Sequence, residues 1–131
     1  MSKKFEFLKE CQRFFVLTVK DDSPIGRPFG AVAEFGSDLY IATSNKKEVY
    51  SQMKQNPNVQ LVAIKDGCRD WIRISGKAEE CQDIETKTKM FEACPVLEKH
   101  YGTPQCEFLA VFKIKVDEAE LSDKDGVNKI D

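Results

Sequence analysis

Polar and basic residues gather where the sequence predicts that a strand ends and a helix begins, at Thr43, Ser44, Asn45, Lys46 and Lys47. We call these residues the basic corner. The first turn of a helix presents free backbone N–H groups and a partial positive charge, so it binds anions. Two lysines and three hydrogen-bonding side chains at that point suit a terminal phosphate group. An ordinary surface helix, capped by Asn45 and with both lysines in solvent, fits the same residues.

Arg27 opens a second segment of interest, Arg27-Pro28-Phe29-Gly30, at the start of the strand predicted before the basic corner. Partner strands of a hairpin run antiparallel, so we expect Arg27 to lie beside the basic corner. A guanidinium group there can bind a phosphate through two parallel hydrogen bonds. Gly30 gives a flat ligand close access to the backbone. In the alternative interpretation, Arg27 lies at a solvated edge and Gly30 forms a bulge.

Trp71 and Arg73 alternate with Ile72 and Ile74 in the segment W-I-R-I-S-G (71–76), so they project from one face of a predicted strand. Tryptophan offers stacking area, and arginine offers hydrogen bonds to a ring carbonyl or a phosphate. Both residue types are also favoured at protein–protein interfaces, so the pair fits a dimer contact as well. The two interpretations are compatible.

The elements that position these residues are mostly strands. Period-two alternation and β-branched or aromatic runs predict strands at 14–20, 28–35, 39–43, 59–65, 71–80 and 108–116. Helical spacing predicts helices at 3–12, after the basic corner, at 83–93 and, as a short turn, at 95–100. Asn45 and Glu48 have capping-box spacing, Asn56-Pro57 ends that helix, and Asp83 caps the next one.

Six strands with mostly short connections predict an antiparallel barrel or sandwich and disfavour a doubly wound parallel sheet. The 131 residues suit one domain, 1–131, with its core at about 5–116. In the last strand, strict alternation points five residues inward, which are Phe108, Ala110, Phe112, Ile114 and Val116. The polar tail at 121–131 is predicted to be loose.

Composition excludes several functional classes. A net charge of −2 and a pI of about 5.5 give no sign of a nucleic-acid or anionic-membrane surface. No run reaches the roughly 20 apolar residues of a membrane helix, and the charged start of the chain does not resemble a secretory signal. We therefore expect a cytoplasmic protein.

The cysteines are odd in number, form no C-x-x-C pair and accompany a single histidine, His100. This pattern predicts no metal site and no disulfide framework. We expect five reduced and mostly buried thiols, and a nucleophilic cysteine paired with His100 is the alternative. The cysteines are Cys11, Cys68, Cys81, Cys94 and Cys106.

Three segments in order, G-R-P-F-G (26–30), T-S-N-K-K with N-P (43–57) and W-I-R-I-S-G (71–76), resemble the pyridoxamine 5′-phosphate oxidase-like, FMN-binding split-barrel superfamily. The resemblance spans about 5–116. It implies a mainly β fold with peripheral helices, a six-stranded antiparallel split β-barrel of Greek-key topology. It also implies a homodimer with two FMN sites at the interface.

Carried over residue by residue, the resemblance assigns the cofactor site to Arg27, Pro28, Phe29, Gly30, Thr43, Ser44, Asn45, Lys46, Lys47, Trp71 and Arg73. Thr43, Ser44 and Lys47 would hold the phosphate. The spacing after Thr43 is shorter than in the oxidase, so Lys46 is an alternative to Lys47. The oxidase's arginine and histidine for substrate near its C-terminus have no match in 121–131, which disfavours pyridoxamine phosphate as substrate.

These implications predict an FMN-binding protein and favour a flavin-dependent oxidoreductase that acts on a small molecule the sequence does not identify. Related small split-barrel proteins include nitroimidazole-resistance-like reductases, in which a histidine near the flavin is expected. The strand at 28–35 has none, and His100 is distant in sequence. The alternatives are a flavin- or haem-binding module without turnover and a structural dimer without cofactor.

Overall fold

Eight strands form one antiparallel sheet in the computed structural model, which describes residues 1–131. The strands are β1 (Phe14–Lys20), β2 (Ser23–Phe29), β3 (Val32–Phe35), β4 (Asp38–Ser44), β5 (Asn58–Ile64), β6 (Trp71–Cys81), β7 (Leu109–Asp123) and β8 (Gly126–Ile130). The helices are α1 (Lys3–Cys11), α2 (Glu48–Gln55), α3 (Ile84–Ala93) and α4 (Val96–Tyr101).

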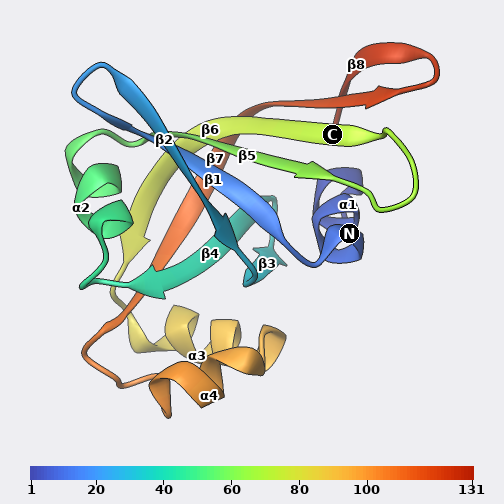
Figure 1. Ribbon diagram of the computed structural model, residues 1–131. Coiled ribbons are helices and arrows are strands. Elements are labelled where there is room, and N and C mark those ends of the chain that lie inside the picture. Colours follow the sequence, from blue (N-terminus) through green and yellow to red (C-terminus); the bar gives the residue numbers. More distant parts are fainter.

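The strand order in the sheet is β2-β1-β5-β6-β7-β4-β3, and β8 pairs with the C-terminal end of β7. The long β6–β7 pair extends from Trp71 opposite Ser122 to Cys81 opposite Val111. It joins the β5-β1-β2 half of the sheet to the β4-β3 half, and the sheet coils into an open barrel with helices at its periphery (Figure 1). The mainly β split-barrel fold that the resemblance implies is confirmed.

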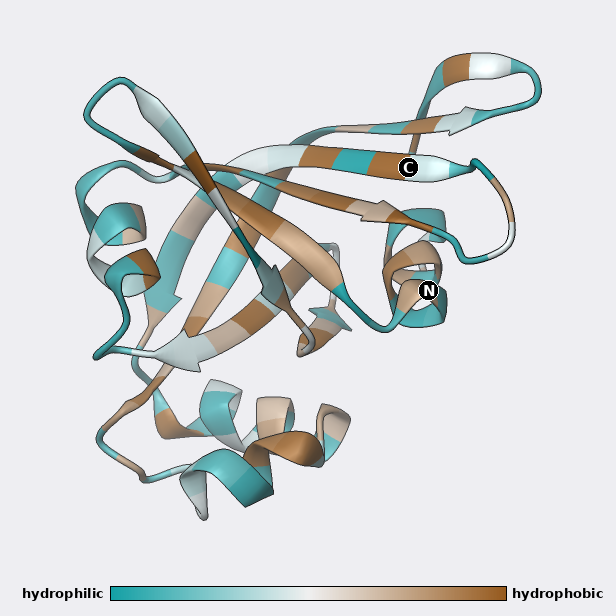
Figure 2. Ribbon diagram, viewed as in Figure 1, coloured by the Kyte–Doolittle hydropathy of each residue, from teal (hydrophilic) through white to brown (hydrophobic).

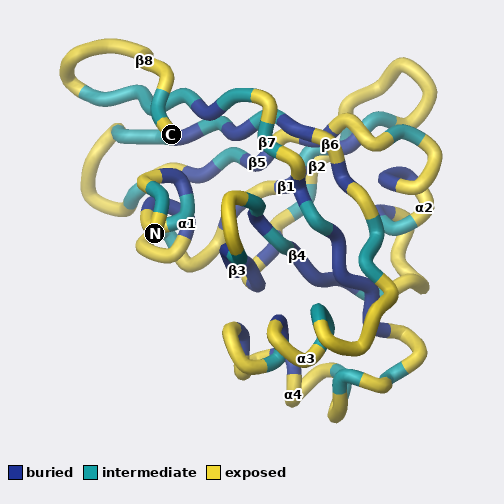
Figure 3. Tube along the Cα trace, turned by 180° about the vertical axis from the view of Figure 1, so that it is seen from behind, coloured by how far each residue is buried: buried dark blue, intermediate teal, exposed yellow.

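Alternating side chains fill the interior of the barrel. Phe14 and Val16 of β1, Ile74 of β6, and Phe112 and Ile114 of β7 are at most 1% exposed, within a cluster of 20 buried residues. Hydrophobic residues follow the central strands in Figure 2, and the buried parts of the trace coincide with them in Figure 3. Burying each large apolar side chain contributes roughly 1.5–3 kcal/mol to folding.

A second cluster of eight buried residues lies on the other face of the sheet, under α3 and α4. Met90 of α3, Cys94 at the end of α3 and Leu97 of α4 pack there against residues of β3, β4 and β7, such as Ala33 and Ala42. Asp83 caps α3 as predicted, since its carboxylate accepts a hydrogen bond of 3.0 Å from the backbone N–H of Thr86. This cluster fixes α4 beside the ends of β2 and β4.

The single strand predicted at 28–35 is wrong. Gly30 and Ala31 separate β2 from β3, and β2 pairs with β1 from Lys20 opposite Ser23 to Phe14 opposite Phe29. The turn before β2 is only two residues long, and Asp21 takes a φ of 56° there. Because β2 is an edge strand that contains two prolines and one glycine, it carries no apolar alternation by which the sequence would reveal it.

The end of the chain also differs from prediction. β7 continues to Asp123, and β8 folds back on it, so residues 121–131 contribute to a hairpin and are not a loose tail. The strand count is therefore eight and not six. Phe108 lies just before β7 and is 37% exposed, whereas it was predicted to point inward.

None of the helices is long and apolar enough to cross a membrane. All five cysteines are free thiols. Only Cys94 is buried and Cys68 is exposed, so the expectation of mostly buried thiols is wrong. A hydrogen bond of 3.3 Å from the Cys94 thiol to the carbonyl oxygen of Val32 helps to attach α3 to the sheet.

Gly76 lies at the irregularity where β6 passes β7, and a Cβ there would overlap the carbonyl oxygen of Lys115. We predict that Gly76→Ala lowers the free energy of unfolding by about 2–3 kcal/mol, because the backbone of β7 cannot move aside. Urea denaturation measures the change. Gly26→Ala is the matched control, since its Cβ would meet Leu17 at an ordinary 3.4 Å. Equal effects of the two substitutions would contradict the prediction.

Candidate functional site

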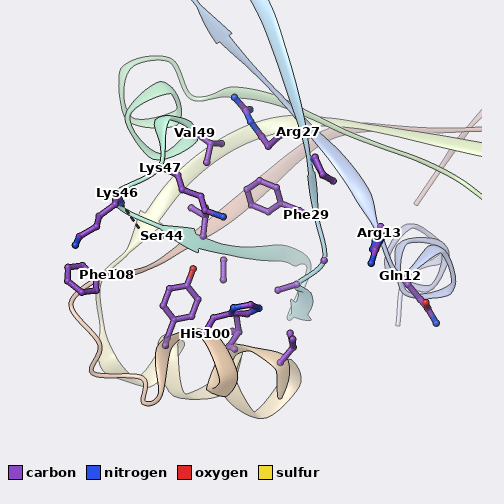
Figure 4. Close-up of a pocket in the computed structure, with 18 residues that line it drawn as sticks. Gln12, Arg13, Arg27, Phe29, Ser44, Lys46, Lys47, Val49, His100 and Phe108 are labelled. Carbon is purple, nitrogen blue, oxygen red and sulfur yellow. Dashed lines mark hydrogen bonds between the residues drawn. The ribbon is translucent and has the colours of Figure 1, made fainter.

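A cavity of about 580 Å³ lies between the end of β2, the end of β4 and α4 (Figure 4). This volume falls in the usual range of small-molecule sites. The cavity brings together eight of the residues assigned to a cofactor site, which are Arg27, Pro28, Phe29, Gly30, Thr43, Ser44, Lys46 and Lys47.

One wall of the cavity is the stretch from Arg27 to Gly30. At one end, Arg27 contacts α2 through a hydrogen bond of 2.6 Å from its Nη2 atom to Gln52 Oε1. At the other end, the Cβ position of Gly30 is 3.9 Å from the carbonyl oxygen of Gln12, just after α1. Extended residues advance about 3.3 Å each, so this wall spans roughly 10 Å. Arg27 does share the cavity with the basic corner, although it belongs to the β1–β2 hairpin and not to the predicted one.

The guanidinium group of Arg27 is held by uncharged oxygen atoms. Its Nη1 atom donates to Thr18 Oγ1 at 2.7 Å and to the carbonyl oxygens of Ile25 and Val16 at 3.1 and 3.2 Å. Burial lowers the pKa of Arg27, and the Glu48 carboxylate opposes this shift only in part. No carboxylate forms an ion pair with it. Its positive charge is therefore oriented without being neutralised.

The two lysines of the basic corner have different surroundings. The Lys46 ammonium lies 3.7 Å from the centroid of the Phe108 ring, a cation–π contact. Lys47 is the N-cap residue of α2, and its side chain points into the cavity in Figure 4. No side chain caps α2, so the first N–H groups of this helix keep their capacity to bind an anion.

Asn45 does not cap α2, so the predicted cap is wrong. It is not among the residues that line the cavity. Its side-chain amide donates a hydrogen bond of 2.7 Å to the carbonyl oxygen of Glu107. Its backbone N–H donates one of 2.9 Å to the carbonyl oxygen of Phe108. Asn45 thus joins the basic corner to the segment before β7. Tertiary contacts of this kind leave no trace in the local spacing from which the cap was predicted.

The charged side chains that line the cavity are all basic. Arg13, Arg27, Lys46 and Lys47 line it, whereas no aspartate or glutamate does. None of these four residues takes part in the ion pairs of the structure. In a chain with a net charge of −2, such a concentration of uncompensated positive charge indicates a site for an anionic ligand.

His100 and Tyr101 of α4 also line the cavity, with ring centroids 6.3 Å apart. The sequence analysis discounted His100 because of its distance along the chain. Leu97 and Tyr101 are one helical turn apart, and both pack on the cluster under α3 and α4. This helical spacing was the sequence signal that α4 packs on the sheet with one face. Burial raises the pKa of the Tyr101 phenol, which keeps it a neutral hydroxyl. No cysteine lines the cavity beside His100, so the structure does not assemble a Cys–His pair there.

Trp71 and Arg73 do not reach this cavity within one chain. Arg73 donates two hydrogen bonds, of 3.1 and 2.9 Å, to Glu120 Oε1, and its guanidinium carbon lies 5.2 Å from the centroid of the Trp71 ring. Both side chains lie on the outer face of β6, opposite to the buried Ile72 and Ile74.

Residues 2–123 match the family model described as pyridoxamine 5′-phosphate oxidase. The chain belongs to this family. Its pyridoxamine 5′-phosphate oxidase fold therefore agrees with the resemblance of the sequence segments. No curated protein sequence matches the chain.

Three solved structures illustrate the range of this fold. A NimC/NimA family protein of Clostridium acetobutylicum is 33% identical, with a TM-score of 0.91 over 98% of this chain and 89% of that chain. A pyridoxamine 5′-phosphate oxidase-related, FMN-binding protein of Nostoc punctiforme is 13% identical, with a TM-score of 0.71 over 95% and 82%. HutZ, the haem storage protein of Vibrio cholerae, is 15% identical, with a TM-score of 0.73 over 98% and 92%.

We predict that inorganic phosphate stabilises this pyridoxamine 5′-phosphate oxidase family protein more than chloride at equal ionic strength. A ligand that binds the folded state but not the unfolded state raises the free energy of unfolding. A gain of about 1 kcal/mol raises Tm by roughly 4 °C at this chain length. Calorimetry measures the difference, which Lys47→Gln should remove. Lys20→Gln, an exposed lysine outside the cavity, should leave it intact. Equal loss in both variants would mean general screening instead of a phosphate site.

Proposed function

We propose that the cavity binds FMN, with its phosphate at the basic corner and its isoalloxazine ring along the wall from Arg27 to Gly30. The observation that carries this proposal is the set of four basic side chains without a carboxylate around one cavity of about 580 Å³. A phosphate needs such charge, and a flat ring needs the extended wall with its exposed Gly30.

The polar groups at the basic corner fit a phosphate. Ser44 and Thr43 supply hydroxyl groups, and the uncapped start of α2 supplies backbone N–H groups. Between the two lysines we favour Lys47, because its side chain points into the cavity while Lys46 contacts Phe108. We assign Asn45 a supporting role, since its amide group bonds to the carbonyl oxygen of Glu107.

Membership of the pyridoxamine 5′-phosphate oxidase family and the FMN-binding Nostoc relative support this cofactor. When bound, FMN would supply one- or two-electron transfer. We infer that the protein is a flavin-dependent oxidoreductase for a small molecule. Its own residues would orient the ring, shield it from water with Phe29 and Tyr101, and hold a neutral hydroxyl at Tyr101 beside the reacting molecule.

Haem is the second candidate, and His100 is the observation in its favour. An imidazole that lines the cavity is a possible axial ligand, whereas no cysteine or methionine lines it. The haem storage protein HutZ shares the fold. The positive charge at the basic corner suits the propionates of haem as well as a phosphate, so only ligand binding separates the two cofactors.

We further infer that the protein forms a homodimer through the outer face of β1, β5 and β6. Phe15 and Ile64 are 53% and 59% exposed, and the register sets Phe15 opposite Val62 and Ile64 opposite Trp71. Arg73 completes this face beside Val62. A contiguous apolar face with Trp and Arg has the composition of an interface core. In the dimer, Trp71 and Arg73 would approach the cavity of the partner.

We predict that the protein binds FMN with micromolar or tighter affinity, measured by quenching of FMN fluorescence. Lys47→Ala should weaken FMN binding by about 10- to 100-fold, because a charge-assisted hydrogen bond to the phosphate is lost. Riboflavin, which has no phosphate, should lose less than about threefold. Lys46→Ala is the matched control, and its effect on FMN should be the smaller of the two.

Equal losses for FMN and riboflavin would remove the phosphate role of Lys47. Tight haem binding with a Soret band that His100→Ala abolishes, without FMN binding, would select the haem candidate. If neither FMN, FAD nor haem binds, a structural dimer is the remaining interpretation. Photoreduction of the FMN-loaded protein, followed by addition of nitroaromatic or quinone acceptors, separates an oxidoreductase from a flavin carrier.

We predict that Ile64→Asp weakens dimerisation by about 100-fold, equivalent to about 2.7 kcal/mol, because it puts a charge into the apolar face. Sedimentation velocity measures the dissociation constant. Val127→Asp on β8 is the control, since Val127 is 51% exposed but lies outside that face. A wild-type protein that stays monomeric at high concentration would refute the interface.

A further inference from the structure

We propose that the rim of the cavity holds an adenine-nucleotide subsite, formed by Lys46 and Phe108, so that the site accepts the whole of FAD as well as FMN. The phosphate that both flavins share would lie at Ser44 and Lys47, and this part of the proposal rests on the proposed function. Lys46 would bind the second phosphate of FAD, and the ring of Phe108 would stack on its adenine.

Lys46 and Phe108 come from distant parts of the chain and meet at the rim of the cavity. The Lys46 ammonium lies 3.7 Å from the centroid of the Phe108 ring, and both residues line the cavity. Asn45 donates hydrogen bonds to the carbonyl oxygens of Glu107 and Phe108, at 2.7 and 2.9 Å. These bonds hold the segment that carries the aromatic ring against the segment that carries the lysine.

This pair lies on the side of the basic corner that points away from the wall proposed for the flavin ring. Figure 4 shows Phe29 on one side of Lys47, and Phe108 on the other. The backbone N–H of Lys46 donates a hydrogen bond of 3.2 Å to Ser44 Oγ, so this lysine is adjacent to a hydroxyl group of the proposed phosphate site. A ligand longer than FMN would therefore continue from the shared phosphate toward Phe108.

Both side chains are available to a ligand. Phe108 is 37% exposed, Lys46 is exposed as well, and no carboxylate forms an ion pair with this lysine. Aromatic side chains bind nucleotide bases by stacking, and lysine binds a phosphate as a point charge. A cation–π contact at an exposed site is weaker than a charge-assisted hydrogen bond to a phosphate. A diphosphate can therefore draw the ammonium group away from the ring and leave that face of the ring to the adenine.

The order of these groups matches the chemistry of FAD. Lys47 and Lys46 are consecutive residues, whose Cα atoms are about 3.8 Å apart, so they suit two linked phosphates. Phe108 lies against Lys46, where an adenine would follow the second phosphate. A free phosphate or the propionates of haem would use the lysines but not the aromatic ring. The contribution of Phe108 to binding therefore distinguishes FAD from these anions.

We expect FAD to bind at least about tenfold more tightly than FMN, because a stacked base and a second phosphate contact add to the shared part of the ligand. Calorimetric titration of the protein with each flavin measures the two dissociation constants. Phe108→Leu keeps an apolar side chain without a ring, so it should abolish the preference for FAD and leave FMN affinity within about twofold. Phe108→Tyr keeps the ring and should keep the preference.

Lys46→Gln should weaken FAD binding about tenfold or more, and FMN binding by less than about threefold. Lys99→Gln is the matched control, because it removes the same charge from an exposed position of α4 outside the cavity. The proposal is overturned if FAD binds no more tightly than FMN, if Phe108→Leu leaves the preference in place, or if Lys99→Gln acts as strongly as Lys46→Gln.

ADP separates this subsite from the proposed function, since it has the adenine and two linked phosphates of FAD but no flavin. In NMR titrations without flavin, the adenine ring protons of ADP should shift upfield as they stack on Phe108, and Phe108→Leu should remove this shift. ADP binding of this kind without flavin binding would keep the adenine subsite and reject the flavin function. FMN binding without any effect of Phe108 on ADP or FAD would keep the flavin function and reject the subsite.

Discussion

Arg27 is bound to oxygen atoms that carry no charge, and the form of the cavity depends on that choice of partners. Thr18 and Gln52, 1% and 5% exposed, both accept hydrogen bonds from its guanidinium group, and Thr18 donates one of 2.6 Å to Gln52. This network ties β2 to β1 and to α2. A carboxylate in the same place would orient Arg27 equally well but would cancel its charge. The contacts that assemble three elements thus leave a positive charge for a ligand.

The rest of the fold separates stability from ligand binding. Of the 20 buried residues in the main cluster, only Phe29 and Val49 line the cavity, and no residue of β6 or β7 does. The cavity is lined mainly by edge strand β2, the last residues of β4, the start of α2 and α4, with Gln12, Arg13 and Phe108 from the adjoining turns. Residues at such borders can change with little effect on the interior, so relatives with one fold differ in what they bind.

The sequence predicted those parts of the fold in which one periodicity dominates. The alternation at 14–20 and 71–80 and the cap at Asp83 are local properties, and the structure has them. β2 was not predicted, because an edge strand with Pro24, Gly26 and Pro28 has no alternation of apolar residues. β8 was not predicted either, because a polar hairpin at the end of a sheet has no pattern of hydrophobic residues.

The residues of the site also fall into those that the sequence predicted and those that it did not. The predicted segment from Arg27 to Gly30 and most of the basic corner do meet in one cavity. The prediction that Asn45 caps α2 was wrong because the partner of its side chain, the carbonyl oxygen of Glu107, is 62 residues away. His100 was undervalued because only the packing of α4 on the sheet brings it close. Periodicity describes one element at a time, whereas these contacts arise when elements from distant parts of the chain pack together.

The packing of α3 and α4 on the outer face of the sheet has a dynamic consequence. Their cluster of eight buried residues is distinct from the main cluster inside the barrel, so we expect α3 and α4 to open as a local unit. Such an opening would expose few apolar side chains and would not require the strand pairing to break. Amide protons of α4 should therefore exchange through local opening, well before those of β6 and β7. The floor of the cavity can then open to admit or release a bound molecule while the barrel stays folded.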